Sequence, residues 1–169
     1  MIAEIGHFAL ILALALAVVQ GTLPLIGAWR RNDSWMAVSR PTVAGQFVFV
    51  SLSLGCLMYA YVASDFSLAN VAANSHSDKP LPYKFSGLWG NHEGSMLLWV
   101  WILALYGVAI AGLGGNLPPP LRARVLAIQG LVGVGFIVFL LATSNPFLRL
   151  DPAPLNGNGL NPLLQDPGL

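Results

Sequence analysis

Hydrophobic residues are concentrated in four long runs, separated by polar or proline-containing segments. The runs are Phe8–Trp29, Thr42–Ser64, Ser95–Leu113 and Val125–Thr143. At 1.5 Å per residue, even the shortest would form an α-helix of about 28 Å, close to the thickness of the hydrocarbon core of a bilayer. Lipid offers the backbone no hydrogen-bond partner, so each run is predicted to be a membrane-spanning helix. Their interiors contain no Lys, Arg, Asp or Glu, which argues against an ion or proton pathway through these helices.

The composition supports the same interpretation. Of the 169 residues, 56% are hydrophobic and 9% are charged, whereas about 25% of the residues of a soluble domain are charged. So few charges cannot cover a water-facing surface, and a net charge of +1 argues against a nucleic-acid-binding protein. We therefore expect an all-α integral membrane protein that contacts the lipid bilayer, with four transmembrane helices and structured outer loops.

The N-terminal run is interpreted as a retained helix and not as a cleaved signal peptide. The segment MIAEIGHFALILALALAVVQG contains Glu4 and has no Lys or Arg before the run, whereas a signal peptide begins with positive charge and has a shorter apolar segment. The single cysteine, Cys56, lies inside the second run. No disulfide framework or metal site is therefore expected.

Loop charges predict the orientation. Five cationic residues lie between the first and second runs or between the third and fourth, and three lie on the other side. The first group is Arg30, Arg31, Arg40, Arg122 and Arg124; the second is Lys79, Lys84 and Arg149. The arginine-rich loops are expected inside, because positive charge is retained in the cytoplasm. Both chain ends and the 65–94 loop of this multi-pass membrane protein would then lie outside.

Two regions are expected: residues 1–144 as the four-helix segment and 145–169 as an outer segment rich in Pro and Gly. Loops as long as 65–94 are usually functional or disordered. Interleaved Leu and Phe in both outer segments, together with Tyr and Trp in the 65–94 loop, argue against disorder.

Small residues recur every fourth position in the first run. Such a stripe allows close approach of another helix, although Ala and Gly are also simply common in membrane helices. The stripe consists of Ala9, Ala13, Ala17 and Gly21. In the same run, Gln20 and Pro24 predict a kink, with Gln20 facing protein and not lipid.

The segment WGNHEGS, before the third run, carries the candidate site residues Trp89, His92 and Glu93. Asn91 is a suitable N-cap, and Glu93 would then lie in the first helical turn, where the helix dipole favours negative charge. One interpretation is a capped helix start with tryptophans at the headgroup interface. The other is a site at the outer interface, where His92 or Glu93 touches a ligand or partner.

The remaining histidines are weaker candidates. His7 lies near the start of the first run, three residues after Glu4, so the two can share one helix face. A single histidine near an interface is most simply structural, and His76 lies in the polar stretch NSHSDKP. No catalytic triad, nucleotide-binding loop or zinc-ligand spacing is present.

Two segments resemble a known family. LWGNHEGSMLLWVWIL and TSNPFLRLDPAPLNGNGLNPLLQDPGL are similar to the N-terminal portion of the F subunit of the cytochrome c maturation system (CcmF), a haem lyase subunit of inner membranes. MIAEIGHFALILALALAVVQ and DFSLANVAANS agree with it, and the resemblance covers the whole chain. It implies that the complete subunit receives haem from a haem chaperone, works with other maturation subunits and attaches haem to apocytochrome c.

The chain departs from the family pattern in one respect. The family's tryptophan-rich haem-binding segment and its haem-ligating histidines are absent, and the resemblance assigns no haem ligation to His7, His76 or His92. We therefore expect this chain to be a truncated product, the ordered part of a longer chain or one piece of a split subunit, which stops before that segment. Alone, it is expected neither to bind haem fully nor to catalyse attachment. The alternative is a helical packing subunit of a transport or respiratory complex, without a ligand site of its own.

Overall fold

The computed structural model describes residues 1–159. Over these residues the chain forms helices and connecting loops, and its only β-type pairing is an isolated bridge between Leu68 and Arg149. The helices are α1 (Ile2–Arg30), α2 (Asp33–Ala37), α3 (Ser39–Ala63), α4 (Ala69–Asn74), α5 (Leu81–Gly87), α6 (His92–Leu113), the 3-10 turn η1 (Gly114–Asn116) and α7 (Pro119–Ala142).

Four helices are long and apolar enough to cross a membrane: α1, α3 with the preceding α2, α6 and α7. The predicted all-helical membrane fold is therefore confirmed. Each long helix begins before its apolar run, by three residues in α3 and α6 and by six in α1 and α7; α7, for example, begins at Pro119. Proline suits the first helical turn because its missing N–H has no partner there in any case.

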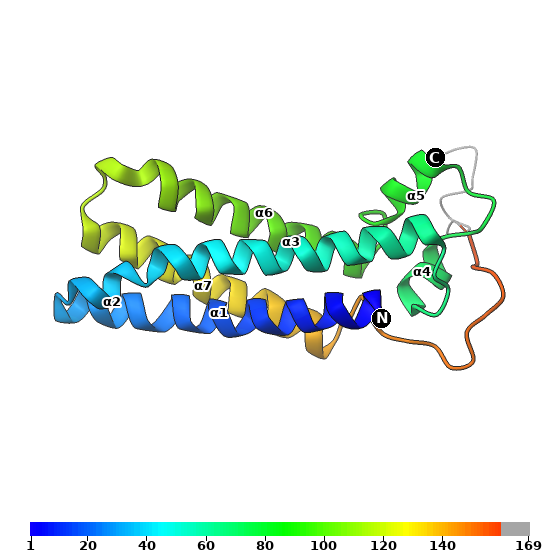
Figure 1. Cartoon of the computed structure of the whole chain (residues 1–169), viewed down its shortest axis with the longest axis horizontal. Helices are drawn as coiled ribbons and strands as arrows, with labels where there is room; N and C mark the ends of the chain where they lie inside the picture. Colours follow the sequence, from blue (N-terminus) through cyan, green and yellow to red (C-terminus); the bar gives the residue numbers. More distant parts are fainter. Residues whose placement is uncertain (160–169) are drawn as a thin grey trace.

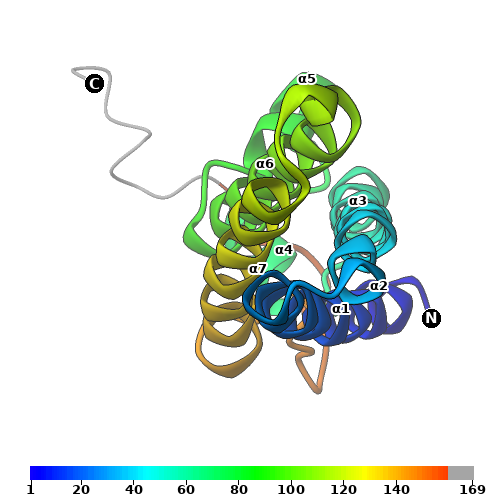
Figure 2. The same ribbon diagram turned by 90° about the vertical axis from the view of Figure 1, so that its left-hand side faces the viewer.

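The four long helices form one bundle, in which α1 packs against α3 and α7, and α6 packs against the same two helices (Figures 1 and 2). We call the end formed by residues 65–94 and 144–159 the loop end. The opposite end, formed by residues 30–41 and 114–124, is called the arginine end. Figure 1 shows α4, α5 and the N-terminus toward the loop end, and α2 at the arginine end.

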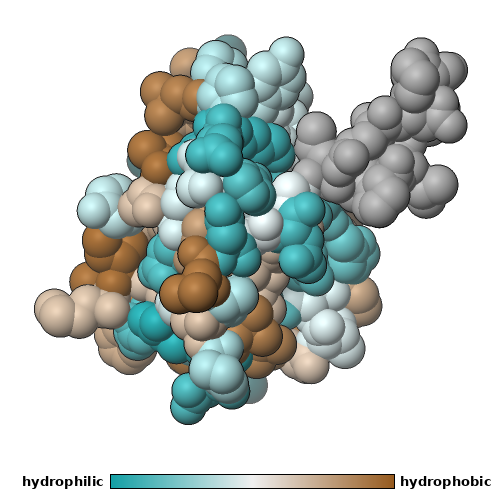
Figure 3. All heavy atoms as spheres, turned by 90° about the vertical axis from the view of Figure 1, so that its right-hand side faces the viewer, coloured by the Kyte–Doolittle hydropathy of each residue, from teal (hydrophilic) through white to brown (hydrophobic). Residues whose placement is uncertain are grey.

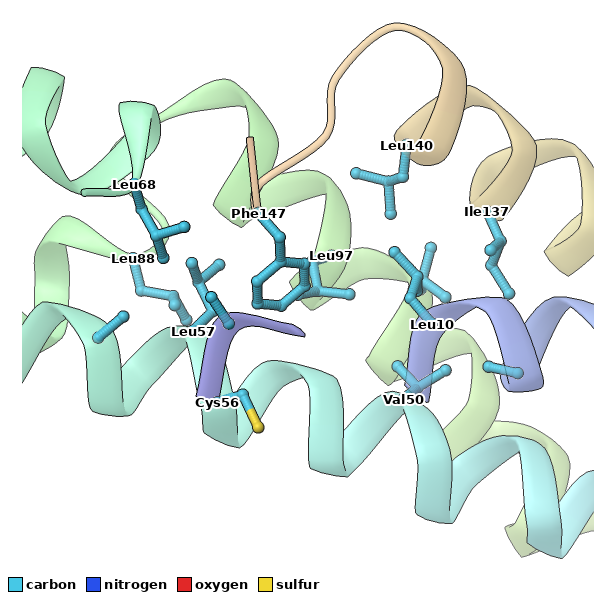
Figure 4. Packing of buried hydrophobic residues seen from close by; sticks show 14 of the residues in the cluster. Leu10, Val50, Cys56, Leu57, Leu68, Leu88, Leu97, Ile137, Leu140 and Phe147 are labelled. Carbon is cyan, nitrogen blue, oxygen red and sulfur yellow. The ribbon is translucent and has the colours of Figure 1, made fainter. Parts of the chain in front are cut away.

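The core combines branched aliphatic side chains with closely packed small residues. Leu10, Val50, Leu97 and Ile137 are buried between the four long helices (Figure 4). The predicted small-residue stripe is buried as well, with Ala13 and Ala17 fully inaccessible. Close approach through small residues is the usual basis of helix association in lipid, where burial of apolar surface gives little driving force.

Polar side chains also connect α7 to its neighbours. Gln20 is fully buried, and its Nε2 donates a hydrogen bond to Leu126 O over 2.7 Å. Gln129 donates to Leu103 O of α6. The prediction that Gln20 faces protein is confirmed, and α1 continues as a helix through Pro24 to Arg30.

A close backbone contact between α1 and α7 supports a first prediction. A Cβ added at Gly130 would lie 2.9 Å from the backbone N of Gly21 and 3.1 Å from Ala17 O. Because backbone atoms cannot move aside easily, Gly130→Ala should lower the free energy of unfolding by roughly 1–3 kcal/mol. The measurement is the thermal unfolding midpoint in detergent.

Gly112→Ala in α6 is the matched control, because no atom lies within 4 Å of its added Cβ. Alanine is the better helix former, so this variant should be as stable as the parent or slightly more so. Equal midpoints for the two variants would contradict the proposed close contact.

Candidate functional site

The segment WGNHEGS connects α5 to α6 at the loop end. Asn91 has extended backbone angles (φ −130°, ψ 165°), and its Oδ1 accepts a hydrogen bond from Gly94 N over 2.7 Å. Asn91 is therefore the N-cap of α6, as predicted, and Glu93 lies in the first turn. A side chain at position 94 would overlap Leu88 O. The glycine is thus needed for the close approach of the turn to the helix.

Three side chains from three different elements form a closed ring of hydrogen bonds. Tyr61 Oη of α3 donates to Asn70 Oδ1 of α4 over 2.6 Å. Asn70 Nδ2 donates to Asn91 Oδ1 over 2.8 Å, and Asn91 Nδ2 donates back to Tyr61 Oη over 2.8 Å. Each member both donates and accepts, so the bonds polarise one another in the same sense. We call this set the Tyr–Asn ring.

Glu93 is attached to the Tyr–Asn ring. Its Oε2 accepts a hydrogen bond from Asn70 Nδ2 over 3.0 Å. The carboxylate thus joins α6 to α4, in addition to lying where the helix dipole favours it. Tyr61 is fully buried, and its hydroxyl is satisfied by these partners. The contacts of Glu93 therefore favour the structural interpretation for this residue.

Trp89 and His92 lie outside the ring. Trp89 has 51% of its surface exposed. The His92 ring is also exposed and meets Phe139 of α7 edge-on, with 6.1 Å between ring centroids. Phe139 also lines an apolar groove of about 340 Å³ between α6 and α7, together with Met96 and Phe136. The turn thus presents an aromatic and a basic side chain beside an apolar surface.

The outer segments are tied to each other by backbone hydrogen bonds. Residues 67–77 and 148–159 are joined at Ala69 N to Leu148 O (2.8 Å), Leu150 N to Ser67 O (2.8 Å) and Asn158 N to Ala72 O (2.7 Å). A side chain at Gly157 would overlap Ser75 O. The stretch NPLLQDPGL, which supports the family resemblance, lies outside the described residues.

A second polar contact fixes the N-terminus to this surface. Glu4 pairs with Arg149 (2.5 Å) and with the terminal amine (2.5 Å), and not with His7. His7 Nδ1 lies 3.4 Å from Asn145 Nδ2 instead. The expected pairing of Glu4 with His7 on one helix face is therefore not formed, because Arg149 offers the carboxylate a charged partner.

Two lysines add hydrogen bonds within the loop end, part of whose surface Figure 3 shows. Lys84 is buried, and its Nζ donates to Ser64 Oγ over 2.7 Å. Lys79 donates to Asn74 O over 3.1 Å, and partial burial lowers the pKa of Lys79. Over residues 1–159, no cluster of three His, Cys, Asp or Glu residues suits a metal ion.

Asn91 and Glu93 were predicted from the sequence as parts of this site, whereas Tyr61 and Asn70 were not. Neither Tyr61 nor Asn70 stands out locally: Tyr61 ends an apolar run, and Asn70 lies in a loop with several polar residues. Their roles arise from the approach of three elements far apart in the chain, which no spacing rule predicts.

The Tyr–Asn ring leads to a second prediction. Asn91→Ala removes the N-cap of α6 together with the hydrogen bonds that Asn91 makes to Tyr61, Asn70 and Gly87 O, so the free energy of unfolding should fall by roughly 2 kcal/mol or more. Ser95→Ala is the control, because its Oγ donates only to His92 O at the surface (3.1 Å); it should cost less than about 0.5 kcal/mol. Thermal unfolding of both variants is the measurement, and similar losses would refute the ring's role.

Comparison with known proteins identifies relatives of this chain. The family model described as "Cytochrome C assembly protein" matches residues 89–169. The chain is 61% identical over 169 residues to the cytochrome c-type biogenesis protein ccl1 of Rhodobacter capsulatus, covering 100% of this chain and 26% of that protein. It is 54% identical to the cytochrome c-type biogenesis protein CcmF of Pseudomonas aeruginosa, with the same coverage of both chains.

A solved structure supports the assignment. The cytochrome c haem lyase CcmF superposes with a TM-score of 0.82 at 28% sequence identity, over 87% of this chain and 25% of that one. The chain thus spans about a quarter of the length of the relatives it matches. On the shared sequence and fold, it belongs to the CcmF family of cytochrome c-type biogenesis proteins and corresponds to their N-terminal part.

Proposed function

We propose that this chain acts in cytochrome c biogenesis as the N-terminal part of a haem lyase subunit, which receives haem from a haem chaperone and attaches it to apocytochrome c. Its relatives are named cytochrome c-type biogenesis proteins, and its structural relative is named a haem lyase. Haem is the substrate here, and other maturation subunits would be further partners.

The proposed location is the bacterial inner membrane, with the loop end in the periplasm. The arginine end carries five arginines, and the loop end carries two lysines and Arg149. A higher density of positive charge marks the cytoplasmic side of membrane proteins. If haem is attached in the periplasm, the surface that contacts haem or apocytochrome lies at the loop end.

The observation that carries the proposal is the exposure of Trp89 and His92 on a turn that Asn91 holds by hydrogen bonds. Asn91 donates to Gly87 O (2.7 Å) as well as to Tyr61, so the turn is held from both sides. Rigid support with exposed aromatic groups suits a contact surface, because little conformational freedom is lost on binding. In this proposal Trp89 and His92 touch haem or apocytochrome during delivery, while Glu93 and Asn91 keep the turn in position.

A third prediction tests whether Trp89 and His92 contact haem or apocytochrome, or only stabilise the fold. The Trp89→Ala/His92→Ala variant of the full chain should lower the yield of c-type cytochrome at least severalfold, at an unchanged amount of membrane-inserted protein. Haem-stained gels of cells that depend on the variant, with immunoblots of the subunit, measure both quantities.

Tyr83→Ala is the matched control, since Tyr83 is also an exposed aromatic residue at the loop end (59% exposed) and lies on α5. This variant should leave the yield unchanged. A normal yield in the double variant would favour a packing subunit without a contact surface. A parallel loss of protein and cytochrome would show that the two side chains are structural.

A further inference from the structure

The arginine end contains a cavity that the haem-related proposal does not use. It has a volume of about 270 Å³ and lies where the start of α7 meets α2 and the start of α3. Its lining combines two arginines with one carboxylate and apolar side chains: Asp33, Met36, Ala37, Ser39, Arg40, Pro119 and Arg122. Residues far apart in the chain therefore meet around one small hollow.

The charge around the cavity is strongly positive. Arg40 and Arg122 line it, and Arg30, Arg31 and Arg124 lie on the neighbouring loops and helix ends. Arg122 is held in place by a hydrogen bond to Gly114 O (3.3 Å), and Arg30 lies over the Trp35 ring at 5.7 Å. Neither contact neutralises a charge, so the guanidinium groups remain available to an anion.

The buried part of the cavity lining is formed by Met36 and by Ser39, whose hydroxyl already donates to Met36 O over 2.8 Å. We call this part the base, and the exposed part that carries Asp33 and Arg40 the rim. Met36 belongs to a small buried cluster with Ala28 and Ala123, which joins α1, α2 and α7. Beside it, Pro119 contributes no backbone N–H. A ligand that fits here has an anionic group for the rim and apolar atoms for the base.

The cavity is also expected at the level of the membrane surface. It is formed at the ends of helices that are apolar enough to span the bilayer. Trp29 is 80% exposed at the end of α1, and tryptophan is enriched at the headgroup level. Basic pockets between membrane helices at this depth are suited to lipid headgroups.

We propose that this cavity binds the phosphate of an anionic glycerophospholipid such as phosphatidylglycerol. Arg40 and Arg122 hold the phosphate, and the lipid's glycerol and upper acyl atoms lie against Met36. A lipid satisfies both the rim and the base, whereas free phosphate satisfies only the rim. Asp33, at the rim, repels part of the ligand's charge and keeps the site weaker than two unopposed arginines would make it.

The fourth prediction is tested by native mass spectrometry of the detergent-purified full chain, titrated with dioleoylphosphatidylglycerol or dioleoylphosphatidylcholine. Each arginine near anionic lipid is worth roughly a fivefold change in affinity, so Arg40→Gln/Arg122→Gln should weaken phosphatidylglycerol binding about 25-fold. Arg31→Gln/Arg124→Gln removes the same charge outside the cavity and should weaken binding far less.

Asp33→Asn is a further control, because it removes the carboxylate that repels the lipid phosphate and should strengthen phosphatidylglycerol binding. A gain in binding cannot result from a loss of folding. Inorganic phosphate at the same concentration should not displace the lipid. Three results would overturn the proposal: equal binding of both lipids, equal losses in the two double-arginine variants, or displacement by inorganic phosphate.

Discussion

Tyr61, Asn70 and Asn91 each donate one hydrogen bond to the next and accept one from the previous side chain. They come from the end of α3, from α4 and from the cap of α6, so one closed ring fixes three elements at the loop end. If one member is lost, the ring opens and the elements that it joins lose two of their mutual hydrogen bonds. The exposed positions of Trp89 and His92 depend on this ring, because it holds the turn that carries them.

Within the membrane, a different constraint applies. Lipid is as apolar as leucine, so association of the helices depends on close packing and on internal hydrogen bonds. The approach of Gly130 to Gly21 and the hydrogen bond from Gln20 to Leu126 O supply both between α1 and α7. The bundle is thereby a rigid base for two different ends, one polar with exposed aromatic groups and one rich in arginine.

Much of this architecture could be predicted from the sequence, since the length and apolar character of a run are local properties. The four spanning helices, the N-cap at Asn91 and the inward-facing Gln20 all follow from such properties. The bonding partners of Glu4 and Glu93 could not be predicted, because Arg149 and Asn70 are far from them in the chain. The arginine-end cavity was likewise missed: its arginines were interpreted only as an orientation signal, although folding brings Arg40 and Arg122 around one hollow.

Hydrogen–deuterium exchange of the Tyr61→Phe variant tests the central claim most directly. This change removes one hydroxyl from α3 and keeps the aromatic ring. If the Tyr–Asn ring couples the loop end, amides of α4 (Ala69–Asn74) and of the first turn of α6 should exchange faster together, while the middle of α1 and α7 stays protected as before. Faster exchange confined to α3, or unchanged exchange in both α4 and α6, would contradict the account.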